Sequence, residues 1–197
     1  MTDKIKYAII GAGCMGQEHI LNIEIIEDAE VVALCDTSEQ SIKECLELLN
    51  NEVAIFEDYN ELVRANIADA FIIATPNFTH IDVLKDVMKS EAHLLIEKPL
   101  CTTVKDCQEF EELSKNYPGV IWTAMEYRYM PPVQRMIQEI HNKTIGDLKM
   151  LSIREHRFPF LHKVDDWNRF TIKTGGTLVE KCCHFFDLMR LIAESEP

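Results

Sequence analysis

The sequence predicts an α/β protein that begins with a doubly wound parallel sheet, the Rossmann arrangement. Short apolar runs alternate with longer amphipathic segments through residues 1–123. The apolar runs are continuous rather than alternating in polarity, which is typical of parallel strands buried on both faces. A glycine-rich turn joins the first run to the first amphipathic segment. Right-handed crossovers between such strands produce a doubly wound sheet.

Each expected element follows from its local pattern. The second amphipathic segment places Ile42, Cys45 and Leu49 at helical spacing. Asp58 is suited to cap a helix, and Pro76 is suited to open one. We therefore expect strands at residues 4–10, 31–35, 53–56, 70–74, 93–96 and 120–124, with helices at 14–26, 38–50, 58–64, 76–90 and 103–115.

The pattern changes after residue 123, so we expect a first domain at 1–123 and part of a second at 124–197. Pro131 and Pro132 are expected to start a helix that runs to about residue 142. Residues 149–158 alternate in polarity and predict a strand with one covered face, and residues 177–193 predict a helix. One strand cannot form a sheet alone, so this second domain is expected to be incomplete.

Composition excludes several functional classes. Lys and Arg number 20 and Asp and Glu 33 among 197 residues, a net charge of −13 that disfavours nucleic acid and anionic membranes as partners. The apolar runs are too short to span a bilayer, and no secretory cleavage site is evident, so a cytoplasmic protein is expected. Seven cysteines without paired spacing predict reduced thiols, with no zinc site.

The glycine-rich turn carries the pattern of a dinucleotide site. Gly11, Gly13 and Gly16 lie between the first strand and the first helix, where glycine permits a tight turn and close backbone approach. Cys14 and Met15 lie at the start of that helix, whose free N–H groups favour a pyrophosphate. These five residues are therefore candidate cofactor contacts, although glycines also mark ordinary turns.

Asp36 ends the second strand, twenty residues after the last glycine of the motif. A carboxylate there accepts hydrogen bonds from ribose hydroxyls and repels a 2′-phosphate. No Arg follows in residues 37–39 to bind such a phosphate, so NAD is favoured over NADP as the cofactor. An Asp that only caps a turn is the simpler alternative.

Two further loops follow the fourth and fifth strands, where ligands gather in an open parallel sheet. Lys98 is a candidate to hold a substrate hydroxyl and stabilise the developing alkoxide. A solvated lysine paired with Glu97 is an equal alternative, and His80 suits a helix face as well as a catalytic role. The candidate cofactor contacts in these loops are Thr75, Pro76, Asn77, His80, Glu97 and Lys98.

A third constellation lies on the last predicted helix. Glu180, His184 and Asp187 stand at i, i+4 and i+7, which places two carboxylates and an imidazole on one helix face. Histidine exchanges protons near neutral pH, and an adjacent carboxylate orients it. A hydrogen-bonded core histidine is an alternative, whereas a metal site would need ligands from other elements.

Taken together, these motifs resemble the Gfo/Idh/MocA oxidoreductases. The resemblance implies an N-terminal Rossmann domain and a C-terminal α+β domain built on a large open sheet that often forms the oligomer interface. It also implies oxidation of a secondary alcohol of a sugar, polyol or cyclitol with NAD(P), or the reverse. The series comprises residues 11–16, Asp36, residues 75–80, Glu97-Lys98-Pro99, Tyr127-Arg128-Tyr129 with Pro132, Ile145-Gly146, and Gly175-Gly176 leading to His184 and Asp187.

The resemblance assigns roles to particular residues. Lys98 corresponds to the family's catalytic lysine, His184 to its acid/base histidine, and Arg128 lies in the substrate region. Glu180 stands where family members usually carry aspartate, and Cys182 where glycine is common, so the substrate identity is open. Family members are considerably longer, so most of the open sheet, and any homo-oligomer built on it, is expected to be absent. A non-catalytic nucleotide-sensing protein, like the galactose-pathway repressors of this fold, is the alternative function.

Overall fold

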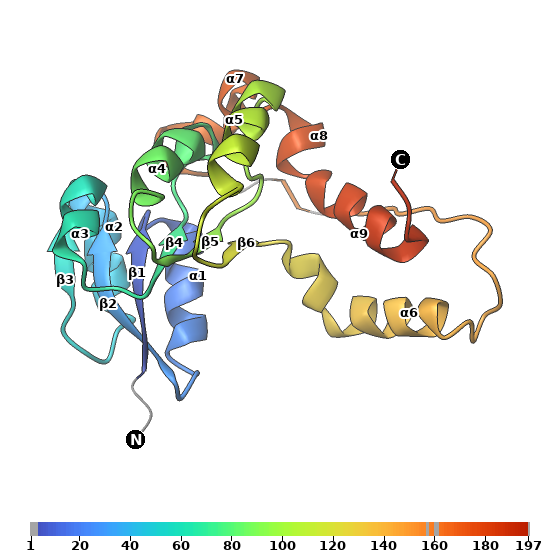
Figure 1. The fold of residues 1–197 in the computed structure, drawn as a ribbon, viewed down its shortest axis with the longest axis horizontal. Helices are drawn as coiled ribbons and strands as arrows, with labels where there is room; N and C mark the ends of the chain where they lie inside the picture. Colours follow the sequence, from blue (N-terminus) through green and yellow to red (C-terminus); the bar gives the residue numbers. More distant parts are fainter. Residues whose placement is uncertain (1–3, 157, 160–161, 197) are drawn as a thin grey trace.

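Six parallel strands form one sheet in the order β3-β2-β1-β4-β5-β6 (Figure 1). The computed structural model describes residues 4–156, 158–159 and 162–196. The strand order reverses between β1 and β4, which is the switch point at which doubly wound sheets bind ligands. The predicted fold class is confirmed. The strands are β1 (Ile5–Ile10), β2 (Ala29–Cys35), β3 (Ala54–Phe56), β4 (Ala70–Ile73), β5 (His93–Ile96) and β6 (Ile121–Thr123).

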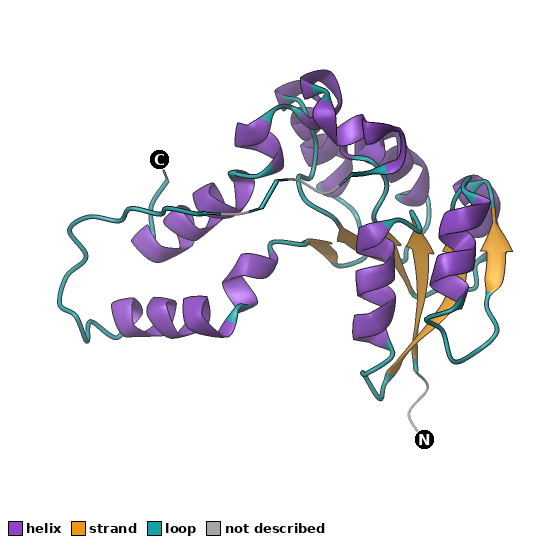
Figure 2. Cartoon of the chain, turned by 180° about the vertical axis from the view of Figure 1, so that it is seen from behind, coloured by secondary structure: helices purple, strands orange, loops and turns teal. Residues whose placement is uncertain are grey.

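Helices cover both faces of the sheet (Figure 2). α1 (Cys14–Ile23) and α2 (Glu39–Leu46) pack on one face, and α3 (Tyr59–Ala65), α4 (His80–Val87) and α5 (Val104–Ser114) pack on the other. Successive residues of β1 serve the two cores, because Ile9 joins Ile20 of α1 whereas Ile10 joins Leu84 of α4. Burial on both faces explains the continuous apolar runs.

Side-chain caps start most of the sheet's helices. Ser38, Asp58 and Thr103 each accept a hydrogen bond from a backbone N–H in the first turn of α2, α3 and α5. α1 is different, since its N-cap is Gly13 and no side chain caps it. The first turn of α1 therefore keeps N–H groups available for an anion.

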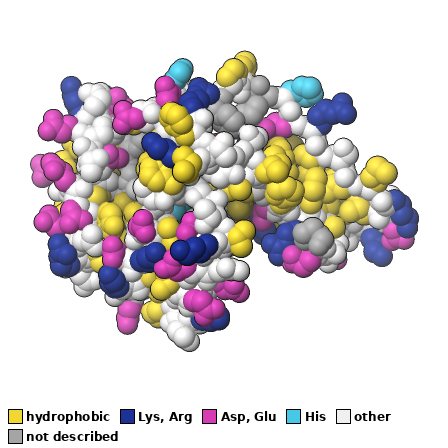
Figure 3. Space-filling view, turned by 90° about the horizontal axis from the view of Figure 1, so that it is seen from above, with side chains coloured by type: hydrophobic (Ala, Val, Ile, Leu, Met, Phe, Trp, Pro, Cys, Tyr) yellow, Lys and Arg dark blue, Asp and Glu magenta, His cyan; other side chains and the backbone are white. Residues whose placement is uncertain are grey.

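The chain leaves the sheet at Thr123, where the sequence predicts the first domain to end. The elements that follow are η2 (Glu126–Tyr129), α6 (Pro131–His141), η3 (Val164–Arg169), α7 (Thr171–Thr174), α8 (Thr177–Glu180) and α9 (Cys183–Ala193). α6 and α9 pack together and project beyond the edge of the sheet as an arm (Figure 1). Figure 3 shows hydrophobic side chains gathered over this arm, whereas charged side chains cover much of the sheet half.

Two sequence predictions are wrong in this second part. Residues 149–156 and 158 form no strand, because no neighbouring strand pairs with them within the described part of the chain, and residue 157 lies outside the described residues. The helix expected at 177–193 is broken at Lys181 and Cys182, where α8 ends and α9 begins. The break turns Lys181 inward, where its side chain is buried against polar partners. Across the described residues, no helix combines the length and the apolarity needed to cross a membrane.

Candidate functional site

The glycine turn is held tightly at two of its three glycines. A Cβ on Gly11, which has φ +102°, would lie 2.5 Å from the Ala74 carbonyl carbon, and one on Gly16 would lie 2.2 Å from the Gly11 oxygen. A Cβ on Gly13 would meet no described atom within 4 Å. Gly11 and Gly16 are thus required by packing, whereas the space at Gly13 suits a bound group. Cys14 is exposed and Met15 half-buried beside it.

Asp36 links the end of β2 to this turn. One carboxylate oxygen accepts a 2.7 Å hydrogen bond from the Ala12 N–H, and the other accepts one of 2.8 Å from the Ser38 N–H. Each oxygen keeps a further lone pair, since a carboxylate accepts about four hydrogen bonds in all. Asp36 is therefore fixed in place while retaining the capacity to accept from a ribose hydroxyl.

The loop after β4 presents one buried and unsatisfied donor. Asn77 is 7% exposed, and its Nδ2 has no hydrogen-bond partner among the described residues. A buried amide without a partner is costly, so it marks a place for a ligand acceptor. Thr75 receives a 2.8 Å hydrogen bond from the Thr79 hydroxyl, and Pro76 precedes η1 (Asn77–Thr79). Together with the uncapped turn of α1, this donor fits a dinucleotide cofactor.

His80 corrects one prediction. Its side chain has no exposed surface, and its ring nitrogens lie 3.0 Å from the carbonyl oxygens of Thr75 and Pro99. A fully enclosed imidazole has no face left for the cofactor, so the expected cofactor contact is wrong for its side chain. His80 instead joins the loop after β4 to the loop after β5. Burial lowers the pKa of His80, although the hydrogen bonds to Thr75 and Pro99 act in the opposite direction.

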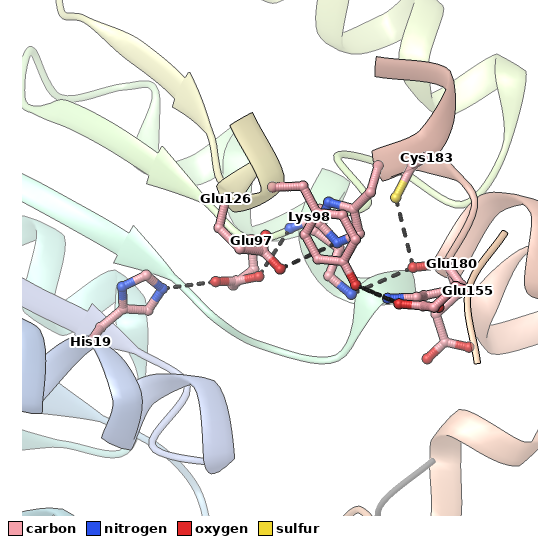
Figure 4. A network of polar contacts seen from close by, with 10 residues as sticks. His19, Glu97, Lys98, Glu126, Glu155, Glu180 and Cys183 are labelled. Atoms are coloured by element: carbon pink, nitrogen blue, oxygen red, sulfur yellow. Dashed lines mark hydrogen bonds and ion pairs between the residues drawn. The ribbon is translucent and has the colours of Figure 1, made fainter. Parts of the chain in front are cut away.

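Glu97 and Lys98 follow β5 and have different partners (Figure 4). Glu97 is buried, with one oxygen 2.8 Å from His19 Nε2 and the other accepting from the Lys98 N–H. The Lys98 ammonium donates to the carbonyl oxygen of Glu180 at 3.4 Å, and the peptide bond to Pro99 is cis. The side chain of Lys98 is therefore not paired with the Glu97 carboxylate, which was the alternative for this lysine.

His184 lies at the start of α9 and is 1% exposed. Its ring stacks on Tyr127, with centroids 4.2 Å apart and planes 7° apart. Its Nε2 lies 3.4 Å from Glu126 Oε1, while its Nδ1 has no hydrogen-bond partner among the described residues. Burial, followed by the positive charges of Lys98 and Lys181, lowers the pKa of His184 to about 4. The imidazole is thus neutral at pH 7 and able to accept a proton.

Lys181 supports this histidine from the turn between α8 and α9. Its buried ammonium donates to the Tyr127 hydroxyl and lies 3.0 Å from Glu155. Burial alone would lower the pKa of Lys181, but hydrogen bonds to Tyr127 and Glu155 outweigh it and raise the pKa. Lys181 therefore stays charged and holds Tyr127 beneath the His184 ring.

The expected single face of Glu180, His184 and Asp187 does not form, because the helix is broken between Glu180 and His184. Glu180 contacts Lys98 through its main-chain carbonyl. Asp187 accepts two hydrogen bonds from the Arg128 guanidinium. Arg128 thus joins η2 to α9.

The network also contains residues that are not among the sequence-based candidates, including His19, Glu126, Glu155, Lys181 and Cys183 (Figure 4). Glu126 carries a usable signal, since it follows a parallel strand at the end where ligands gather. Glu155 carries none, because its position depends on an irregular segment. All seven cysteines are free thiols, and no cluster of three metal-ligating side chains occurs among the described residues.

Comparison with known proteins extends over the whole chain. Residues 5–125 match the model of an oxidoreductase family with an NAD-binding Rossmann fold, and residues 137–197 match that family's C-terminal alpha/beta domain. A myo-inositol 2-dehydrogenase of Thermotoga maritima is 27% identical over 192 residues. The rhizopine catabolism protein MocA of Rhizobium meliloti is 25% identical over 194 residues.

A crystal structure of a probable dehydrogenase from Thermotoga maritima superimposes with a TM-score of 0.81 at 25% identity, covering 98% of this chain and 56% of that one. The two curated relatives are likewise covered only in part. The matches include 98% of this chain in both cases, but 56% of the inositol dehydrogenase and 59% of MocA. The chain therefore spans a little over half the length of the proteins it resembles.

Proposed function

Because this chain belongs to the Gfo/Idh/MocA oxidoreductase family, as its motif series predicts, we propose that it transfers a hydride between NAD and a secondary alcohol of a sugar, polyol or cyclitol. The observation that carries the proposal is the meeting of Lys98 and His184 in one polar network. Lys98 reaches the carbonyl of Glu180, four residues before His184, and its charge lowers the pKa of that histidine.

The cofactor supplies the hydride acceptor when bound. The residues that hold it are the glycine turn with Cys14 and Met15, the Asp36 carboxylate, and the loops at residues 75–77 and 97–98. The buried, unpartnered Asn77 Nδ2 and the uncapped first turn of α1 support this assignment. Asp36 favours NAD over NADP, because its carboxylate repels a 2′-phosphate.

The chain's own residues move the proton. His184 is neutral, so its imidazole accepts the proton of the substrate hydroxyl as the carbinol hydrogen leaves. The Lys98 ammonium donates to the same oxygen and stabilises its developing negative charge. Glu180 contributes its carbonyl to the placement of Lys98, and its side chain remains a candidate substrate contact beside Arg128.

Cofactor titration and a substrate screen test this function. We expect saturable quenching of tryptophan fluorescence by NADH, and reduction of NAD by at least one member of a panel of cyclitols, polyols and sugars. Lys98→Ala and His184→Ala should each lower kcat about 100-fold or more, and NADH binding should persist in His184→Ala. Lys105→Ala, on the exposed surface of α5, is the matched control. NADH binding without turnover across the panel would support the nucleotide-sensing alternative.

A further inference from the structure

A carboxylate outside the motif series lies against His184. Glu126 opens η2, three residues after β6 ends. Its side chain is 51% exposed, and its Oε1 lies 3.4 Å from His184 Nε2 (Figure 4). The His184 imidazole is itself only 1% exposed, so Glu126 provides its link to the solvent.

The positive charges near His184 disfavour its protonated form, which a nearby carboxylate would stabilise. Lys98 and Lys181 keep the imidazole neutral, which suits a base but opposes the imidazolium that forms once the base has acted. Glu97 and Asp187 favour the charged ring, yet Glu97 pairs with His19 and Asp187 pairs with Arg128. Glu126 is the carboxylate whose oxygen lies against Nε2.

The surrounding contacts fix the direction in which the ring can exchange a proton. Tyr127 stacks flat on the imidazole, and Lys181 holds the Tyr127 hydroxyl. Rotation of the ring is thus restricted, so that Nε2 continues to face Glu126. Partial burial raises the pKa of Glu126, while the charges of Lys98 and Lys181 oppose that rise.

We propose that Glu126 is a positioning residue that stabilises the His184 imidazolium and conducts its proton to solvent. This inference rests on the proposed function. In alcohol oxidation the substrate O–H bond breaks as an Nε2–H bond forms, and the carbinol hydride passes to NAD. The Nε2–H bond then breaks as an O–H bond forms on Glu126, whose carboxyl group releases the proton to water. The reverse sequence delivers a proton for carbonyl reduction.

Charge-neutral and charge-conserving variants test the kinetic part. We expect Glu126→Gln to lower kcat for alcohol oxidation about 10-fold or more, with little change in the KM for NAD. Glu126→Asp should recover part of the loss, because it keeps the charge, and acetate should rescue the Gln variant in proportion to its concentration. Glu111→Gln, on the exposed surface of α5, should behave as wild type. Equal kcat in the wild-type protein and Glu126→Gln would overturn the proposal.

An NMR titration of His184 in the full chain separates this inference from the proposed function. We expect the His184 pKa to be lower in Glu126→Gln than in the wild-type protein and close to wild type in Glu126→Asp. An unchanged pKa in Glu126→Gln would overturn the pairing even if the enzyme turns over. A lowered pKa in a protein without any turnover would support the pairing and remove the proposed function together with the proton transfer to solvent.

Discussion

Each half of this protein buries a histidine, and the two histidines differ in their partners. The sheet half comprises the described residues up to 123, and the helical half comprises the described residues from 124 on. His80, beside the sheet, has a carbonyl oxygen 3.0 Å from each ring nitrogen. His184, at the start of α9, faces Glu126 at 3.4 Å and has no hydrogen-bond partner at Nδ1 among the described residues. The first imidazole is held between two loops, whereas the second retains unused hydrogen-bonding capacity.

This difference follows from how the two halves are packed. The sheet half has two apolar cores, one on each face of the sheet. His80 lies between backbone carbonyl oxygens of the loops after β4 and β5 and so joins these two loops. In the helical half Leu188 and Ile192 are buried. Large apolar side chains such as Met150 and Phe158 are more than four-fifths exposed. Stability is therefore concentrated in the sheet half, and reactive groups lie where it meets the helical half.

The largest expected effect compares the two cores directly. Leu62→Ala should lower the free energy of unfolding by about 2–5 kcal/mol, because Leu62 is fully buried between α3 and the sheet. Leu188→Ala, in α9, should cost about 1–2 kcal/mol, since Leu188 belongs to neither of the two apolar cores of the sheet half. Urea unfolding measures both, and hydrogen exchange shows which region loosens.

The comparison of Leu62→Ala with Leu188→Ala could also contradict the idea that stability is concentrated in the sheet half. If Leu188→Ala destabilises the protein as much as Leu62→Ala, and protection falls across all six strands, the two halves unfold as one unit. Glu111→Gln on α5 serves as the surface control and should leave the midpoint unchanged.

The second expected effect is a loss of stability in acid. The pKa of His184 is lowered to about 4, whereas an unfolded histidine has a pKa of 6.5, so the unfolded state binds more protons between these values. Stability from this group is complete above about pH 6.5 and is lost as the pH falls toward 4. The contribution lost between pH 7.5 and pH 5 is about 2 kcal/mol.

His184→Asn isolates this contribution, because asparagine does not titrate. We expect the difference in unfolding free energy between pH 7.5 and 5 to be smaller in the variant than in the wild-type protein. His80 shares the downward pKa shift and contributes a pH dependence of the same sign in both proteins. An identical dependence in the two proteins would show that His184 is not held neutral by its surroundings.

The sequence predicted the sheet half well, because local patterns there decide the outcome. Continuous apolar runs predicted the six strands, and the spacing of Gly11, Gly16 and Asp36 predicted a turn that the structure places beside β4. The predicted cap Asp58 located the start of α3 to within a residue. Each of these signals acts over a few neighbouring residues.

The helical half was harder to predict, because its geometry depends on contacts between distant residues. Helical periodicity continues through residues 177–193, yet the chain turns at Lys181 to bring its ammonium to Glu155 and Tyr127. Alternation at 149–158 indicates a strand only where another strand is available to pair with it. The contact between Glu126 and His184 joins residues 58 positions apart, which no local pattern encodes.

The smallest expected effect concerns His80, the histidine that lies between the two loops. His80→Gln should lower the free energy of unfolding by about 1 kcal/mol, because the flexible glutamine amide can replace the one hydrogen bond that a neutral imidazole donates to these carbonyl oxygens but does not fill the buried site of the ring. NADH affinity should weaken with it, since Thr75 belongs to one proposed cofactor loop and Pro99 follows the other. His156→Gln, in an exposed segment, should change neither quantity. If His80→Gln weakens NADH binding without any loss of stability, His80 acts on the cofactor itself rather than through the loops it joins, and the distinction between the two histidines fails.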